Sequence, residues 1–468
     1  MGKKVGERRD VCRGKAKTII SVLDRYESSG GLYHNYLRTG YHAPVIEKQK
    51  GIYLWDVEGN EYIDTTGGFC AVFQGYCPEE ITEEVKKCMD TLCYLPEMPS
   101  PVRAQLAKEI VEIAPGELKE GKVQFELGGH STVDLALQIA QFYAKATRKE
   151  YTRHLILSFF GAYHGRTALT SSVSSLSRFT QKFPVFTETI KVPYAYCYRC
   201  YYGLHYPECE MACIRYIQKL FESDLHGVYD TQTKQSLIST LIVEPLQDYA
   251  GMIIPPREFH PMLKKLCEDH KIVFIADEVP GFLHTGKWFS IEHWDVVPDI
   301  ILTAKPLGGG FWPMGAVIAR KEIMEVWEQP GMHFTTYMGN PIGCTAALIN
   351  LRVIKEKNLL KKIEEVGNYF KQGLMDLYQR HKIIGDVSGL GGLLGIELVK
   401  DRKTKEPALT ERDAFAGEAL SLGVVVADAM GNTSRCLFIP PAIMTRKEID
   451  IVMSVLDRSL EKVEKLYT

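Results

Sequence analysis

The fold is decided by three apolar runs that each end in an ionisable residue: Leu241-Ile-Val-Glu244, Ile272-Val-Phe-Ile-Ala-Asp277-Glu278 and Ile300-Ile-Leu-Thr-Ala-Lys305. Runs of this kind are typical of strands that are covered on both faces of a sheet. Further strand candidates at 122–127 and 154–159 alternate with helical patterns such as that of residues 131–146. This alternation predicts an α/β sheet.

Asp277 and Lys305 follow predicted strands directly, where open α/β sheets bind their ligands. Charged groups there carry a desolvation cost unless they are paired or used in function. One interpretation is a catalytic or binding site, and the alternative is a structural Asp–Lys ion pair. The residues alone leave both open.

Another predicted strand leads into Gly128-Gly129-His130-Ser131 and then into a helix with one apolar face. Glycines allow the backbone to approach a ligand, and the free N–H groups at a helix N-terminus suit an anion such as phosphate. The alternative is an ordinary strand-to-helix turn with Ser131 as the N-cap.

The composition restricts the class of protein and its partners. The chain has 468 residues, enough for a large domain and a smaller one. Its net charge of −2 gives no electrostatic argument for a nucleic acid or a membrane as partner. No apolar run has the length of a membrane span, and the basic N-terminus lacks a signal-peptide core. We therefore expect a cytoplasmic protein.

Four of the twelve cysteines are clustered: Cys197, Cys200, Cys209 and Cys213. Four thiolates at paired spacing could hold a structural zinc ion tetrahedrally. The alternative is a set of free or redox-active thiols. Without a secretory signal, a disulfide framework is not expected.

Taken together, these segments resemble the class III (ω-amino acid) aminotransferases, which are pyridoxal 5'-phosphate (PLP) enzymes of fold type I. The resemblance runs from Tyr53-Leu-Trp-Asp-Val-Glu-Gly-Asn-Glu-Tyr62 to Pro440-Pro441, and its most specific part extends from Asp277-Glu-Val279 to Pro313-Met-Gly-Ala316. It implies a large domain with a mostly parallel seven-stranded sheet between helices, plus a smaller α+β domain from both chain ends. We expect an N-terminal segment with part of the small domain at 1–75, the large domain at 76–340 with a Cys-rich insertion at 194–215, and the C-terminal small domain at 341–468.

The resemblance also implies a role for each matching residue. Lys305 would be the Schiff-base lysine that also moves a proton, and Asp277 would keep the ring nitrogen of the cofactor protonated. Thr336 matches a threonine that reaches the phosphate from the partner subunit, which implies a homodimer, or a tetramer, with shared active sites. The implied cofactor-binding residues are Gly129, His130, Tyr163, Glu244, Asp277, Val279, Lys305 and Thr336.

The implied reaction moves an amino group from an amine or amino acid to a 2-oxo acid, such as pyruvate or 2-oxoglutarate, in two half-reactions. An amino acid racemase or epimerase on the same scaffold is the alternative. A non-catalytic PLP-binding or metal-binding protein is a further one.

The substrate-binding residues are among the positions where the sequence departs from the family pattern. Tyr249 replaces the second Glu of the motif Glu-Pro-x-Gln-Gly-Glu, and Leu437 stands at the spacing of the substrate arginine. Arg435 lies two residues earlier and would share a strand face with that position. Tyr249 and Arg435 are therefore the substrate candidates, with a structural salt bridge as the alternative for Arg435.

Overall fold

The computed structural model describes residues 2–9, 13–28, 36–37, 39–40, 42–95, 97–148, 155–176, 186–223, 225, 227–429 and 433–467. The chain divides into two compact units. The large unit is Glu80–Lys357, and the small unit combines Met1–Glu79 with Asn358–Thr468.

The large unit is built on a seven-stranded sheet. Its strands follow the order β4 (Lys122–Glu126), β12 (Gly315–Ala319), β11 (Ile300–Thr303), β10 (Val273–Asp277), β9 (Ile238–Val243), β5 (Leu155–Phe159) and β6 (Thr189–Val192). Neighbours from β11 to β6 are parallel, and β12 is antiparallel to both of its neighbours. The predicted α/β fold with a mostly parallel seven-stranded sheet is confirmed.

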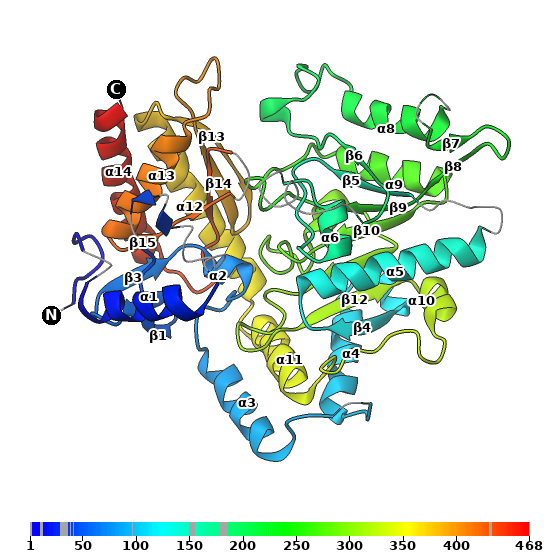
Figure 1. Cartoon of the computed structure of the whole chain (residues 1–468), viewed down its shortest axis with the longest axis horizontal. Helices are drawn as coiled ribbons and strands as arrows, with labels where there is room; N and C mark the ends of the chain where they lie inside the picture. Colours follow the sequence, from blue (N-terminus) through cyan, green and yellow to red (C-terminus); the bar gives the residue numbers. More distant parts are fainter. Residues whose placement is uncertain are drawn as a thin grey trace. The chain divides into compact units, whose positions relative to one another are not determined.

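The apolar runs in the sequence became the buried strands of this sheet. Every residue of β5, β9, β10, β11 and β12 is buried, as in strands covered on both faces. Helix α5 (Gly129–Thr147) lies along the sheet and packs on β9 to β12 through its apolar face (Figure 1). That face contains Val133, Ala136 and Ala140, the residues whose helical spacing predicted it.

The remaining elements of the large unit are short strands and surrounding helices. They are α3 (Glu79–Thr91), α4 (Pro101–Glu112), η2 (Gly116–Glu120), α6 (Ala168–Val173), η3 (Cys197–Arg199), α8 (Ala212–Glu222), β7 (Tyr229–Asp230), β8 (Gln235–Ser236), α9 (Phe259–Asp269), η5 (Ser290–Trp294), α10 (Lys321–Trp327) and α11 (Pro341–Glu356). Helix α11 packs on α4 and shares a buried cluster with α3. It therefore belongs to the large unit, whose end at Lys357 lies beyond the expected boundary at 340. The change of pattern at Pro341 marks the start of a helix rather than a change of domain.

The small unit contains two four-stranded sheets and its own core. One sheet has the order β1 (Ile46–Lys50), β2 (Tyr53–Asp56), β3 (Glu61–Asp64) and β15 (Val424–Val425), and the other has the order β13 (Ile384–Leu390), β14 (Leu393–Leu398), β17 (Arg435–Phe438) and β16 (Ala427–Asp428). Its helices are α1 (Gly14–Tyr26), α2 (Gly67–Cys70), α12 (Leu359–Arg380), α13 (Leu409–Ser421) and α14 (Arg446–Tyr467). Phe370 of α12, Ile396 of β14 and Leu456 of α14 belong to one buried cluster. Among the described residues, no helix is both long enough and apolar enough to cross a membrane.

Candidate active site

The candidate site lies at the carboxyl edge of the large sheet, where neighbouring parallel strands end together. Asp277 is the last residue of β10 and pairs in register with Leu302 of β11, three residues before Lys305. The two ionisable residues singled out in the sequence thus follow adjacent parallel strands. Glu278 has a structural role instead. Its carboxylate accepts a hydrogen bond from the Ile291 N–H at 2.7 Å, which holds η5 against the end of β10.

Asp277 is buried and held by two hydrogen bonds. Its Oδ1 accepts the N–H of Val279 at 3.0 Å, and its Oδ2 lies 2.7 Å from Nδ1 of His164. His164 is itself buried, and its Nε2 has no hydrogen-bond partner among the described residues. A buried carboxylate needs such partners to offset the loss of hydration. His164 therefore fixes the orientation of Asp277.

Lys305 makes its ion pair with a residue that the sequence analysis did not single out. Its Nζ lies 3.1 Å from Oδ2 of Asp248, whose side chain is buried. The same Nζ lies 4.7 Å from the ring centroid of Tyr249, within the range of a cation–π interaction. The Lys305 ammonium is therefore held between a carboxylate and an aromatic face.

Glu244 follows β9, the next strand of the sheet, and connects these groups electrostatically. Its Oε2 accepts the N–H of Tyr163 at 3.1 Å, while its Oε1 is buried and has no hydrogen-bond partner in the described part of the chain. Burial raises the pKa of Glu244 well above its usual range, and the charge of Asp277 adds to this effect while Lys305 opposes it. The register of the sheet places Val243 beside Ala276 and Asp277 beside Leu302, so the ends of β9, β10 and β11 converge on one site.

Two tyrosines of the site contact each other, and one of them also contacts Lys305. The ring centroids of Tyr163 and Tyr249 are 4.5 Å apart at an interplanar angle of 50°. Tyr163 precedes His164 in the loop after β5, so one short segment supplies both an aromatic ring and the partner of Asp277. Tyr249 is buried, and its contact with Lys305 places it beside the reactive amine expected from the sequence.

The glycine-rich turn before α5 packs closely against this loop and against Val279. A Cβ at Gly129 would lie 2.9 Å from Cγ1 of Val279, closer than real side chains approach. Gly165 has a φ of +124°, and a Cβ there would lie 2.8 Å from Cβ of His130. The close approach therefore requires glycine at both positions. It brings the N-terminus of α5, with its free N–H groups, to the same edge of the sheet.

The structure leaves Thr336 apart from these residues. Thr336 is exposed, and its neighbour Thr335 donates a hydrogen bond from Oγ1 to Oε1 of Glu126 at 3.3 Å. Nothing within the described chain gives Thr336 a place in the site.

Arg435 does not have the environment of a substrate-binding residue. It is buried in β17 of the small unit, and its Nη1 lies 3.0 Å from Asp386 Oδ2 and 2.9 Å from Glu397 Oε2. Its Nη2 donates a hydrogen bond to Ser388 Oγ. These partners bind the Arg435 guanidinium within the small unit. The arrangement therefore favours a structural salt bridge over a substrate-binding role for Arg435.

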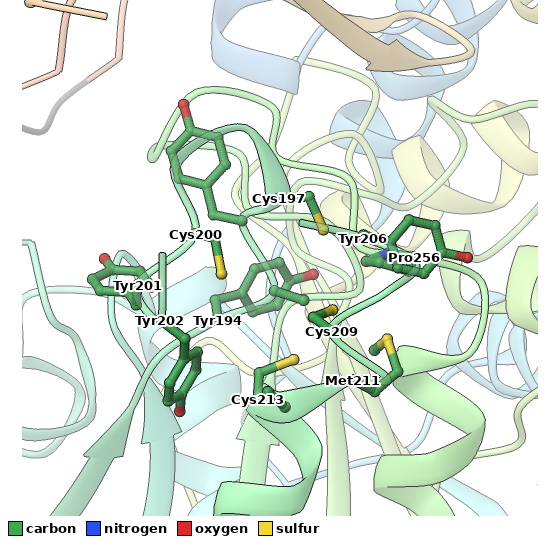
Figure 2. A pocket seen from close by; sticks show the side chains of 13 residues that line it. Tyr194, Cys197, Cys200, Tyr201, Tyr202, Tyr206, Cys209, Met211, Cys213 and Pro256 are labelled. Carbon is green, nitrogen blue, oxygen red and sulfur yellow. The ribbon is translucent and has the colours of Figure 1, made fainter. Parts of the chain in front are cut away.

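The four cysteines expected to bind zinc surround one small cavity in the large unit (Figure 2). None of them forms a disulfide. Among the described residues, no group of three or more His, Cys, Asp or Glu side chains has the arrangement of a metal site. The structure as it stands therefore does not contain the expected zinc site.

Comparison with known proteins identifies relatives along nearly the whole chain. The family model described as "Aminotransferase class-III" matches residues 36–460. A leucine/methionine racemase of Thermococcus litoralis is 34% identical over 448 residues, which cover 95% of this chain and 96% of that protein. A probable 4-aminobutyrate aminotransferase of Bacillus subtilis is 32% identical over 419 residues, covering 88% of this chain and 92% of that protein.

The fold is also shared with solved structures. An amine transaminase from an uncultivated Pseudomonas species, solved in a PLP-bound form, superposes with a TM-score of 0.83 at 26% identity. The superposition covers 93% of this chain and 98% of that one.

The environment of Arg435 yields a prediction about stability. We expect Arg435→Leu to lower the free energy of unfolding by about 3–5 kcal/mol, because it leaves Glu397 and Asp386 without their counter-ion. Urea unfolding of purified protein measures this change. Arg257→Leu is the matched control: its pair with Asp295 is exposed, so its loss should cost about 1 kcal/mol or less. Unchanged stability together with a raised KM for a carboxylate substrate would restore the substrate role of Arg435.

Proposed function

Because the chain belongs to the class-III aminotransferase family, we propose that it binds PLP at the carboxyl edge of the large sheet and moves an amino group from an amine or amino acid to a 2-oxo acid. The observation that supports this most directly is the convergence of Asp277, Lys305 and Glu244 at three neighbouring strand ends. The donor and the acceptor are proposed as classes, with pyruvate and 2-oxoglutarate as the acceptors to test.

The residues present suit the chemical groups of PLP. Asp277 offers a buried carboxylate for the ring nitrogen, and Lys305 offers a primary amine for the aldehyde. Tyr163 supplies an aromatic ring to stack on the pyridine, and Val279 supplies an apolar face. The unpaired Oε1 of Glu244 is a buried polar atom that calls for a partner. The N–H groups of Gly129 and His130 at the start of α5 suit the phosphate.

Each of these residues would contribute a separate step. When bound, PLP supplies a ring that accepts the electrons left when a proton leaves the substrate carbon. Asp277, oriented by His164, would hold a proton at the ring nitrogen. Lys305 would carry the proton removed from the substrate carbon, since its amine is the basic group at the site. Asp248 would form an ion pair with the Lys305 ammonium whenever Lys305 is not bonded to the cofactor, as it does in the present structure.

A homodimer is part of this proposal. Thr336 is exposed and is followed by Tyr337, whose exposed ring lies 5.3 Å from that of Tyr94. Phe334, two residues before Thr336, is also exposed, so exposed aromatic side chains lie on both sides of this threonine in the sequence. A strictly monomeric protein in analytical ultracentrifugation would contradict the shared site. We also propose the cytoplasmic location expected from the sequence.

Amino acid racemisation is the second candidate, and the similarity to the leucine/methionine racemase of T. litoralis favours it. In that reaction Asp248 would be the second group that exchanges a proton, once Lys305 has moved away from it to engage the cofactor. Both candidates use the same cofactor residues and differ in whether a 2-oxo acid is consumed.

Replacement of the proposed lysine tests the assignment of the site. We expect Lys305→Ala to lower kcat by about 10³-fold or more, because the group that carries the proton is lost. Some PLP should remain bound through the other contacts, and visible absorbance after dialysis measures it. Lys321→Ala is the control, since Lys321 is exposed on α10 and should leave turnover unchanged. Turnover of Lys305→Ala at the wild-type rate would refute the assignment.

A single-enantiomer assay separates transfer from inversion. Wild-type protein is incubated with L-leucine, L-methionine or L-alanine, with and without pyruvate or 2-oxoglutarate. We expect product only when an acceptor is present, with one acceptor consumed per amino group moved. Formation of the D-enantiomer without an acceptor would contradict amino-group transfer and would support racemisation as the function. In that case Asp248→Asn, which keeps the shape and removes the charge, should lower inversion more than it lowers the transfer half-reaction.

A further inference from the structure

The connection between α10 and α11, named here the connecting segment, comprises residues 328–340 and begins along the edge strand β4. Side chains at alternate positions of a strand share one face. At the first such position, Lys122 forms an ion pair with Glu328. Two residues later, Gln124 accepts a hydrogen bond at 3.0 Å from Nε1 of Trp327, the last residue of α10. The connecting segment is therefore fixed to β4 at its start.

Glu126 is the third residue of this row and the last residue of β4. Because β4 and β11 are both antiparallel to β12, they run in the same direction, and Glu126 lies at the carboxyl edge of the sheet. Its buried carboxylate accepts hydrogen bonds from Nε2 of His333 and, at 3.3 Å, from Oγ1 of Thr335. Glu126 therefore holds the connecting segment a second time, further along its course.

The bond to His333 keeps Glu126 charged despite its burial. Burial acts to raise the pKa of Glu126, but the hydrogen bond and the charge of His333 outweigh it, and the pKa is lowered. An ionised carboxylate only accepts hydrogen bonds, so His333 is the donor. Hydrogen bonds between ionised groups are short and hold their geometry firmly. The Glu126–His333 pair is therefore the strongest of the contacts that hold the segment to β4.

The same carboxylate is tied to the glycine-rich turn before α5. Its Oε2 accepts the N–H of Leu127 at 3.2 Å, and a hydrogen bond with Ser131 also helps to lower the pKa of Glu126. Ser131 in turn donates from Oγ to the backbone oxygen of Gly128 at 2.9 Å. Glu126 is thus a fixed acceptor, to which the connecting segment is attached through His333.

Thr336 lies between this attachment and the start of α11. Its neighbour Thr335 bonds to Glu126, and the side chain of Asn340 accepts the N–H of Gly343 at 2.8 Å as the N-cap of α11. Thr336 itself is exposed. The segment is therefore anchored on both sides of a threonine that faces outward.

We propose that the Glu126–His333 pair positions Thr336 for the cofactor phosphate of the partner subunit. This inference rests on the proposed function, because the phosphate and the shared site both belong to it. His333 and Glu126 are positioning residues, since they act through Thr336. A displacement of about 1 Å is enough to break a hydrogen bond to a phosphate oxygen, so a loosened segment weakens the cofactor site without a change in the groups that react.

The proposal places the effect of the pair in the other subunit. Each connecting segment serves the phosphate of the partner, so loss of His333 in one chain weakens the cofactor site of the other chain. A pair that only stabilised its own large unit would weaken the site of its own chain, or neither site. The location of the defect therefore separates a positioning role from a merely structural one.

Cofactor binding to the apoprotein is the first measurement. We expect His333→Ala to raise the dissociation constant of PLP about 10-fold, the effect of losing one hydrogen bond to a charged group. His333→Gln, which keeps an N–H donor, should lie closer to the wild type. His205→Ala, at an exposed histidine of the same unit, should leave the constant unchanged. Amide hydrogen exchange of the apoprotein should rise at residues 334–337 in His333→Ala and stay unchanged in β10.

Mixed dimers then locate the defect. A dimer of one Lys305→Ala chain and one chain with Lys305 has a single lysine that borohydride can link to PLP. With His333→Ala on the Lys305→Ala chain, trapping at Lys305 should require about 10-fold more PLP than in the reference dimer. With His333→Ala on the chain that keeps Lys305, trapping should need the same PLP concentration as the reference.

An unchanged dissociation constant in His333→Ala would overturn the proposal, and so would a defect confined to the chain that carries the substitution. If His333→Ala does not fold, Glu126→Gln gives the same two comparisons, because it removes the charge and keeps an acceptor for Leu127. Wild-type protein that binds no PLP or forms no dimer would refute the proposed function instead. That result is read from the wild type alone, so the two failures are distinguishable.

Discussion

The hydrogen bond between Asp277 and His164 is the interaction on which the arrangement of the site depends. A carboxylate at the end of a fully buried strand is costly unless donors surround it. His164 Nδ1 and the Val279 N–H supply those donors at 2.7 and 3.0 Å. The same bond fixes the loop after β5 against β10, although β9 lies between these two strands in the sheet. Tyr163, the neighbour of His164, is positioned as a consequence.

The charges of the site are unevenly distributed. Three carboxyl groups, those of Glu244, Asp248 and Asp277, lie near one lysine, and a buried cluster of this kind cannot ionise fully at low cost. Burial and the charge of Asp277 raise the pKa of Glu244 well above its usual range, which disfavours its charged form. Asp248 balances the ammonium of Lys305. Among the described residues, no Lys or Arg forms an ion pair with Asp277, and a protonated ring nitrogen of a cofactor would supply the missing positive charge.

The sequence predicted the parts of this site that depend on strand ends, and it missed those that depend on loop conformation. Asp277, Lys305 and Glu244 each close an apolar run, and parallel strands bring such ends to one edge. His164 and Asp248 lie in loops, and no periodicity indicates where their side chains point. The position of His164 directly after Tyr163, a predicted cofactor-binding residue, could have indicated that His164 also lies at the site. The sequence leaves the role of Arg435 open, because residues i and i+2 of a strand share a face and Arg435 could therefore point into the pocket. The structure shows that its guanidinium forms ion pairs with Asp386 and Glu397 instead.

The pair formed by Lys305 and Asp248 links the structure to the choice between transfer and inversion. Transfer requires one basic group on one face of the substrate carbon, and Lys305 alone can fill that role. Inversion requires a proton to return from the opposite face, so a second group must lie across the substrate. At 3.1 Å the two groups are too close to flank a carbon atom, and they can only exchange a proton with each other. The present arrangement therefore favours transfer. Inversion demands that Lys305 move away from Asp248 when it engages the cofactor, while Asp248 stays in place with the ring of Tyr249 beside it.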